Sequence, residues 1–126
     1  MKKIIKTASA PAPIGPYNQA VMAGDTLYIS GQIAIDPATG NMLQDSIQEE
    51  AMQVMQNLKA ILNEAGMEYA NIVKTTIFLK TMNDFSAVNE VYASCFENNF
   101  PARETVAVAG LPKNANVEIS VIAVKL

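Results

Sequence analysis

Residues 46–66, SIQEEAMQVMQNLKAILNEAG, decide the fold because they carry the longest helical pattern of the chain. Ser46 and Glu49 match a capping box at the start, and Gly66 supplies a stop. The pattern predicts an amphipathic helix of about five turns, whose apolar face must be buried against another element. Its apolar residues recur at helical spacing: Ile47, Ala51, Val54, Met55, Leu58, Ile61, Leu62 and Ala65.

Strand patterns surround this helix. They are short runs rich in β-branched and aromatic residues, separated by turn-forming Gly, Pro, Asn and Asp. The last two runs are predicted to form a hairpin across the loop 111–115. Three runs precede the helix and three follow it: residues 2–7, 17–24, 26–35, 71–80, 104–110 and 116–125.

A second helix is predicted over residues 83–96, behind an Asn or Asp cap. The order β, β, β, α, β, α, β, β predicts an α+β fold of one domain, residues 1–126, with two helices on one face of a mixed six-stranded sheet. The last strand is apolar on both faces, with Val117 and Ile119 on one and Ile122 on the other. Because the helices cover only one face, the second apolar face predicts a homo-oligomer with a functional cleft between subunits.

Composition excludes several classes of function. The net charge is -3 and the nine basic residues form no stripe interleaved with aromatics, so nucleic acid is not an expected partner. No apolar stretch is long enough for a membrane span, and the single cysteine, Cys95, suits a reducing compartment, so a cytoplasmic protein is expected. Histidine is absent, which removes the commonest general base and the usual zinc, copper and non-haem iron sites.

Two charged residues interrupt the apolar C-terminal region: Arg103, the only arginine, and Glu118. In a hairpin that turns near residues 112–113, Glu118 would pair with Ala107, and the two charges would share one sheet face, roughly 13 Å apart along the strands. A guanidinium holds a carboxylate through two hydrogen bonds, and a glutamate on an apolar face has a raised pKa that suits proton transfer. One interpretation is a pocket for a small carboxylic acid, and the other is a structural ion pair of Arg103 with Glu118 or Glu104.

Five segments together resemble the RidA/YjgF family, the reactive intermediate deaminases. They are IGPYNQA, YISGQI, VNEVYASCF, FPAR and LPKNANVEI, in the order and spacing of the family, and the resemblance runs essentially end to end. Its most specific part is the Pro-Ala-Arg motif with a Val-Glu-Ile glutamate fifteen residues after the arginine.

The resemblance implies a chorismate-mutase-like fold assembled as a homotrimer, with sites in the clefts between subunits. It also implies hydrolysis of 2-iminobutanoate and 2-iminopropanoate to 2-oxo acids and ammonia, without a metal or cofactor. By the same resemblance, Arg103 holds the substrate carboxylate and Glu118 activates the attacking water. By the resemblance, Tyr17 and Gly31 also line the pocket, together with the backbone around Ser30 and Thr105.

A non-catalytic trimer that binds small carboxylates or other proteins is the alternative function. Glu118 favours the enzyme, because a second negative group near Arg103 would not improve the binding of a carboxylate. Ribonuclease activity, sometimes attached to proteins of this family, is disfavoured by the net charge and by the lack of histidine.

The chain departs from the family directly after the arginine. Deaminase members commonly have a small residue and then a cysteine, whereas this chain has Glu104 and Thr105. A cysteine nucleophile is impossible at that position, so the sequence favours a water molecule held by Glu118. Glu104 is expected to face away from Arg103, exposed to solvent or bridging subunits.

Other residues have plain structural interpretations when the resemblance is set aside. Gly31 can mark a strand bulge, and Tyr17 can pack in a turn. Cys95 lies on the apolar stripe of the second helix and is expected in the core. Asn89 is expected at the surface or in a polar contact between subunits, and it is not assigned to the site.

Overall fold

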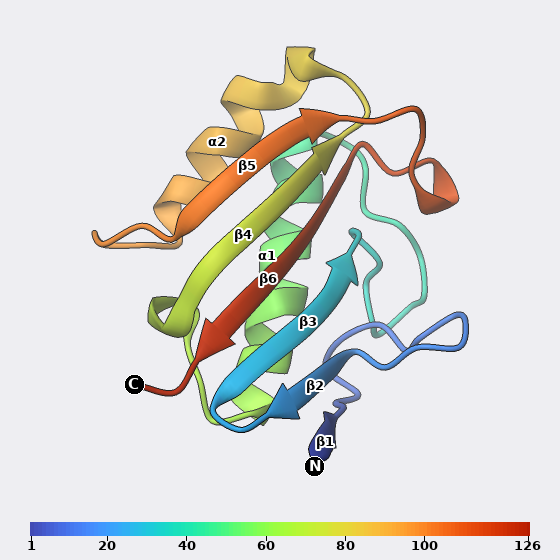
Figure 1. Ribbon diagram of the computed structural model, residues 1–126. Helices are drawn as coiled ribbons and strands as arrows, with labels where there is room; N and C mark the ends of the chain where they lie inside the picture. Colours follow the sequence, from blue (N-terminus) through green and yellow to red (C-terminus); the bar gives the residue numbers. More distant parts are fainter.

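A computed structural model describes residues 1–126 and contains a six-stranded sheet with two helices packed on one face (Figure 1). The predicted order of elements and the α+β class are confirmed. In chain order the elements are β1 Lys2–Ile5, β2 Ala20–Ala23, β3 Thr26–Gln32, α1 Ile47–Glu64, β4 Ile72–Leu79, α2 Phe85–Ser94, β5 Ala102–Ala107 and β6 Val117–Val124.

Helix α1 forms where its pattern predicts. The Ser46 hydroxyl accepts a hydrogen bond from the Glu49 N–H at 3.0 Å, which satisfies one of the unpaired donors of the first turn. Gly66 has a φ of 75°, in the left-handed region that glycine adopts without strain, and it lets the chain turn away after the last turn. The inner side of α1 is completely buried, with Leu58 and Ile61 both at 0% exposure.

Helix α2 is shorter than predicted and is capped differently. It spans Phe85–Ser94, and the Asp84 side chain makes no capping hydrogen bond. A single 3-10 turn, Met82–Asp84, precedes it instead, and the Thr81 hydroxyl accepts from the Asn83 N–H at 3.2 Å. The cap therefore lies one short turn earlier than the sequence pattern suggested.

The strand order corrects the predicted hairpin. The order is β1-β2-β3-β6-β4-β5, so β4 lies between β5 and β6. β5 pairs in parallel with β4, and β6 pairs antiparallel with β3 and β4. Glu118 therefore lies opposite Phe78, not opposite Ala107. The physical reason is the long connection from Ala107 to Val117, which is not a tight hairpin turn and passes over the end of β4.

The core lies between the helices and one face of the sheet. Alternate residues of each central strand point into it, for example Ile77 and Leu79 of β4, which are 1% and 0% exposed. Neither helix combines the length and the apolar composition that a membrane span needs.

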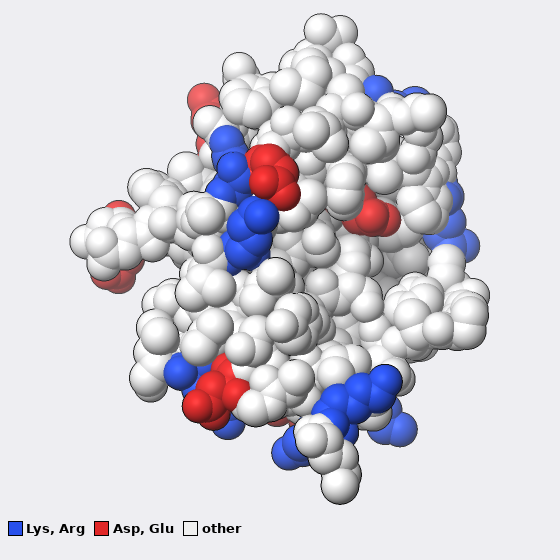
Figure 2. All heavy atoms as spheres, in the orientation of Figure 1, with Lys and Arg blue, Asp and Glu red and all other residues white.

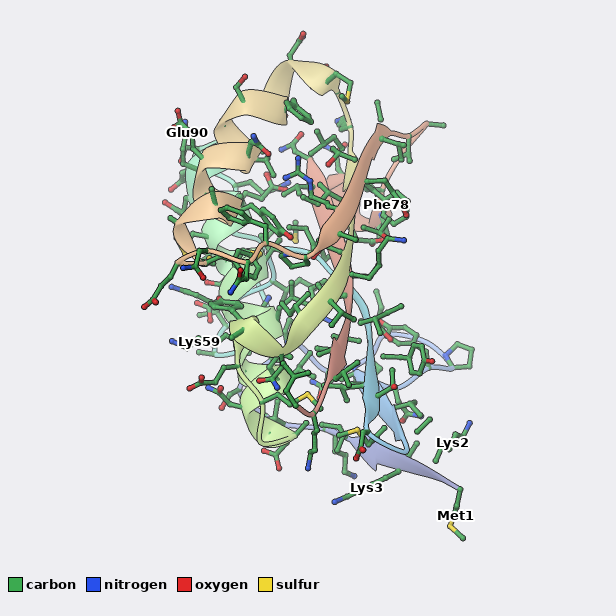
Figure 3. The ribbon with its side chains drawn as sticks, turned by 60° about the vertical axis from the view of Figure 1, so that its left-hand side comes forward. Met1, Lys2, Lys3, Lys59, Phe78 and Glu90 are labelled. Carbon is green, nitrogen blue, oxygen red and sulfur yellow. The ribbon has the colours of Figure 1, made fainter.

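The opposite face of the sheet carries exposed apolar residues, as predicted, beside polar and charged ones. Tyr28 of β3 and Val106 of β5 lie on it and are 50% and 44% exposed. Phe78 of β4 points the same way, away from the helices on which Lys59 and Glu90 lie (Figure 3). Most of this face is uncharged, although a group of basic and acidic atoms lies over β4 and β5, where Lys74 pairs with Glu104 (Figure 2). We call it the open face.

Candidate active site

Arg103 lies on β5, at the edge of the sheet, and points to the helix side. Its partner in the register is the buried Thr75, which sets this direction. The Arg103 Nη1 donates a 2.6 Å hydrogen bond to Asn89 Oδ1, and the guanidinium carbon lies 5.1 Å from the Tyr92 ring centroid and 5.8 Å from the Phe85 ring centroid. These three contacts all come from α2, so the helix fixes the direction of the guanidinium while most of its donors stay free for a ligand.

A hollow of about 390 Å³ adjoins this arginine. Its other walls are mostly apolar, and Phe100 at its mouth is 57% exposed. The apolar walls lower the local dielectric, which strengthens a charge-assisted hydrogen bond between the guanidinium and a bound carboxylate. The hollow is lined by Asn89, Tyr92, Ala93, Phe100, Pro101 and Arg103.

Glu118 lies on β6 and faces the open side of the sheet, opposite Phe78. Partial burial raises the pKa of its carboxyl above the ordinary value, and no hydrogen bond or cation within the same chain opposes this effect. A carboxylate with a raised pKa and no competing donors is suited to take a proton from water.

Gly31 makes room for this carboxylate. A Cβ atom at position 31 would lie 2.7 Å from Glu118 Oε2, closer than real Cβ contacts allow. The register between β3 and β6 also shifts between Ile29 and Gln32, so the bulge interpretation of this glycine is confirmed. Gly31 therefore marks a strand bulge and also lies against Glu118, because the bulge brings the backbone of β3 next to the acidic side chain.

Glu118, Gly31 and Tyr17 line one small cavity of about 60 Å³. This volume holds a few water molecules, and the cavity walls carry both polar and apolar groups. Figure 2 shows a hollow beside the end of β3 with acidic atoms at its rim. The side chain of Tyr17 is 46% exposed, so the cavity opens at the loop that carries this tyrosine.

Ser30 holds the Tyr17 loop in place. Its hydroxyl donates to the Asn18 carbonyl at 2.6 Å, and its N–H donates to the Gln19 carbonyl at 2.9 Å. The Ser30 side chain is therefore committed to the scaffold and does not line the cavity.

The predicted common face for Arg103 and Glu118 is wrong. They lie on opposite faces, two strands apart, and their register partners on β4 are Thr75 and Phe78. Ideal strand spacing puts their Cα atoms roughly 14 Å apart across the sheet. One chain therefore contains two separate half-sites: Arg103 with its α2 contacts, and Glu118 with Gly31 and Tyr17.

The alternative of a structural ion pair is also wrong. Arg103 forms no ion pair with either glutamate, and the ion pair of the chain joins Lys74 to Glu104 at 3.3 Å. Glu104 faces away from Arg103, on the open face, with 56% of its side chain exposed. The predicted orientation of Glu104 is confirmed.

Thr105 shares the face of Arg103, two residues along β5. Its Oγ1 is buried and has no hydrogen-bond partner.

The free thiol of the chain, Cys95, lies at the end of α2 and packs against the core, where burial raises its pKa and disfavours the thiolate. Neither residue supplies a nucleophile to either half-site.

Asn89 is a candidate site residue that the sequence analysis did not assign to the site, and the structure places it against Arg103. It lies on the same helical stripe as Phe85 and Tyr92, four residues after one and three before the other. A lone amide on an aromatic, core-facing stripe was a signal that it faces a polar partner inside the molecule. That partner is Arg103.

Comparison with known proteins identifies the class to which this fold and these half-sites belong. A family profile described as Endoribonuclease L-PSP matches residues 7–125. The human 2-iminobutanoate/2-iminopropanoate deaminase is 46% identical over 125 residues, which cover 99% of this chain and 91% of that protein. The chain belongs to the RidA/YjgF/L-PSP family.

Two solved structures agree with this assignment. The Rid family protein YyfA of Yersinia pestis is 48% identical, with a TM-score of 0.96 over 99% of this chain and 100% of the other. Escherichia coli TdcF, solved with bound serine, is 42% identical, with a TM-score of 0.94 over 98% of this chain and 99% of the other. A relative of the same fold thus binds a small molecule that carries a carboxylate.

Proposed function

We propose that this protein is an enzyme that hydrolyses small 2-imino acids, 2-iminobutanoate and 2-iminopropanoate, to 2-oxo acids and ammonia. The observation that carries the proposal is the Glu118 carboxylate, whose pKa is raised by burial, beside a cavity large enough for water. The function in the name of the human relative, 46% identical, supports the same substrates.

The site forms between two copies of the chain. Arg103 and Glu118 lie on opposite faces of one sheet, so a single copy cannot bring both to one small substrate. The apolar open face gives a reason for copies to associate, because residues such as Tyr28 and Val106 are half exposed in one chain. We infer a homotrimer in which Glu118 of one subunit lies beside Arg103 of another.

In the proposed reaction Arg103 binds the substrate carboxylate through its free N–H donors, and the unpaired edge of β5 offers the Thr105 backbone to the same group. Glu118 takes a proton from water as the water oxygen bonds to C2 of the protonated imine and the electron pair of the C=N double bond moves to nitrogen. Glu118 then returns this proton to the amino group of the tetrahedral intermediate. As the C–N bond breaks and ammonia leaves, Glu118 takes the proton of the C2 hydroxyl group, and the C2 oxygen becomes the carbonyl.

A coupled assay tests the activity. A threonine dehydratase supplies 2-iminobutanoate, and semicarbazide traps the imine that has not been hydrolysed. The wild-type protein is expected to reduce trapping, while Arg103→Ala and Glu118→Gln are expected to lose about 10²-fold or more of the rate. A wild-type protein without effect on trapping would remove the enzyme, and Glu118→Gln at full rate would remove the proposed base.

Mixing the two inactive variants tests where the site lies. In trimers assembled at random from equal amounts of Arg103→Ala and Glu118→Gln chains, about a quarter of the sites between subunits combine an intact arginine with an intact glutamate. Activity should therefore return to about a quarter of the wild-type level after co-refolding. If the site lay within one chain, the mixture would stay inactive.

A further inference from the structure

Glu50 is a carboxylate that is fully buried in the first turn of α1. Its Oε2 accepts the backbone N–H of Asn116 at 2.7 Å, and its Oε1 accepts Nδ2 of the same residue at 2.8 Å. It forms no ion pair, since the ion pair of the chain lies elsewhere, between Lys74 and Glu104. A buried carboxylate is costly unless hydrogen bonds satisfy it, so the two bonds tie α1 to Asn116 strongly.

Asn116 is held from other directions as well. Its carbonyl accepts the Lys80 N–H at 3.0 Å. Gln44 Nε2 bridges Glu50 Oε2 at 3.4 Å and the Asn114 carbonyl at 3.1 Å. Asn114 has a φ of 55°, in the left-handed region that asparagine adopts more readily than most residues, and the bond from Gln44 ties this turn to α1. We call the contacts between Glu50 and Asn116 the clamp.

The clamp lies two residues before Glu118. No hydrogen bond fixes the Glu118 carboxylate, so the backbone at the start of β6 decides where that carboxylate lies in the cavity. Pro112, from the same loop, lines the cavity with Glu118. A shift of the loop would therefore move both the base and one wall of the space that holds water.

We propose that Glu50 is a positioning residue that acts through Asn116 to hold Glu118 in its cavity. The proposal rests on the proposed function, in which Glu118 moves the proton of the attacking water. Arg103 lies on β5 and takes its contacts from α2, outside the clamp. The clamp should consequently govern the rate of the chemical step more than the binding of the substrate carboxylate.

The donors and acceptors of the clamp can be exchanged. Asn116→Asp places two carboxylates at hydrogen-bond distance, where they repel. Glu50→Gln/Asn116→Asp restores the match, because the new amide at position 50 donates to the new carboxylate at position 116 and its oxygen still accepts the backbone N–H. Glu50→Gln alone should lower kcat less than Asn116→Asp, since the Asn116 amide can rotate and accept a hydrogen bond from the new amide. The double variant also keeps the net charge of the wild-type chain.

Steady-state kinetics on the full chain test the proposal. Asn116→Asp should lower kcat about 10- to 100-fold with KM within about twofold, and Glu50→Gln/Asn116→Asp should return kcat to within about threefold of wild type. Asn71→Ala is the matched control, because Asn71 Nδ2 donates to the Val124 carbonyl at 3.0 Å at the other end of β6. It should lower Tm and leave kcat unchanged, which separates positioning from a general loss of stability.

The carbon-13 resonance of the Glu118 carboxyl group gives a readout that does not depend on activity. It should shift in Asn116→Asp and return in Glu50→Gln/Asn116→Asp. If wild type does not hydrolyse the imine, the proposed function fails while this resonance still reports on the clamp. An unmoved resonance, an unchanged kcat in Asn116→Asp, or a loss that the double variant does not recover overturns the proposal. If Asn116→Asp does not fold, Asn116→Ala keeps the backbone hydrogen bond and should give a kcat fall of about three- to tenfold.

Discussion

Arg103 and Glu118 are held in opposite ways. The side chain of Arg103 is fixed by three contacts from α2, one hydrogen bond to Asn89 and two aromatic rings. The side chain of Glu118 has no hydrogen bond, and its place follows from the backbone of β6 and from the missing Cβ at Gly31.

The difference in how the two side chains are held fits the roles of Arg103 and Glu118 in the proposed reaction. A guanidinium keeps its charge in any environment, so neighbours can orient it without weakening it as a carboxylate ligand. A carboxylate that accepts hydrogen bonds has a lowered pKa and becomes a poorer base. Within one chain no hydrogen-bond donor lowers the pKa of Glu118, and the backbone positions it. Activity should therefore depend on the chemistry of the Arg103 side chain in the arginine half-site. In the glutamate half-site it should depend on the position of the backbone and on the volume of the side chains that contact Glu118.

The largest effect is expected for Arg103→Lys, which keeps the charge and removes the planar fork. The substitution loses the paired hydrogen bonds to the carboxylate and the stacking on Tyr92, so kcat/KM should fall by about 10²- to 10⁴-fold. Arg103→Ala is the reference, and it should be at most about tenfold worse than Arg103→Lys if geometry matters more than charge. Coupled imine hydrolysis measures both, and Arg103→Lys within threefold of wild type would contradict the comparison.

A smaller effect is expected for Gly31→Ala. The added methyl group would lie 2.7 Å from Glu118 Oε2, so the carboxylate must move, and kcat should fall about 10- to 100-fold with little change in KM. Gly110→Ala is the matched control, because nothing lies within 4 Å of a Cβ at that position. A normal kcat in Gly31→Ala would mean that the glutamate half-site tolerates displacement, against the role assigned to the backbone.

The sequence predicts the features of the fold that depend on residues close together in the chain better than those that depend on distant ones. Local patterns predict the elements well: the Ser46 cap, the Gly66 stop and the alternation in β6 each act within a few residues, and each is found. The pairing of strands depends on the whole sheet. Nothing near Ala107 or Val117 indicates that β4 lies between β5 and β6, so the predicted hairpin between β5 and β6 is wrong.

The same reasoning applies to the site. The types of its charged residues pointed to carboxylate binding and proton transfer, and the resemblance named Tyr17 and Gly31, which do line the Glu118 cavity. The strand error put both charges on one face, whereas the structure separates them. Asn89 was missed because its partner, Arg103, is brought to it only by tertiary packing of α2 on β5.

Asn89 should have a moderate effect, and mainly on binding. Asn89→Ala removes the acceptor that orients Arg103 Nη1, so KM should rise about 5- to 10-fold while kcat changes less. Asn89→Asp sharpens the test, because its carboxylate would pair with the guanidinium and compete with the substrate. KM should be higher in Asn89→Asp than in Asn89→Ala. The reverse order would mean that Asn89 does not face the substrate end of the arginine.

The smallest effect concerns stability and follows from the raised pKa of Glu118. Because burial raises this pKa in the folded chain above its unfolded value, the folded state holds the proton more tightly, and stability falls as pH rises through the folded pKa. Glu118→Gln has no charge to bury, so in the Arg103→Ala background, which removes the cation that the proposed trimer brings beside position 118, it should raise Tm at pH 7 by about one or two degrees. The difference should vanish well below pH 4.5, the ordinary value, where the Glu118 carboxyl is protonated.

Glu104→Gln gives the contrast on the same face of the sheet. Glu104 is largely exposed and paired with Lys74, so its replacement should leave Tm unchanged or slightly lower at pH 7. Thermal unfolding at one protein concentration measures both variants, because association also raises Tm. In the Arg103→Ala background, a Tm for Glu118→Gln below that of Arg103→Ala at pH 7 would mean that other partners stabilise the carboxylate. The pKa of Glu118 would then be lowered rather than raised, and the base would be held like the arginine, by its side chain.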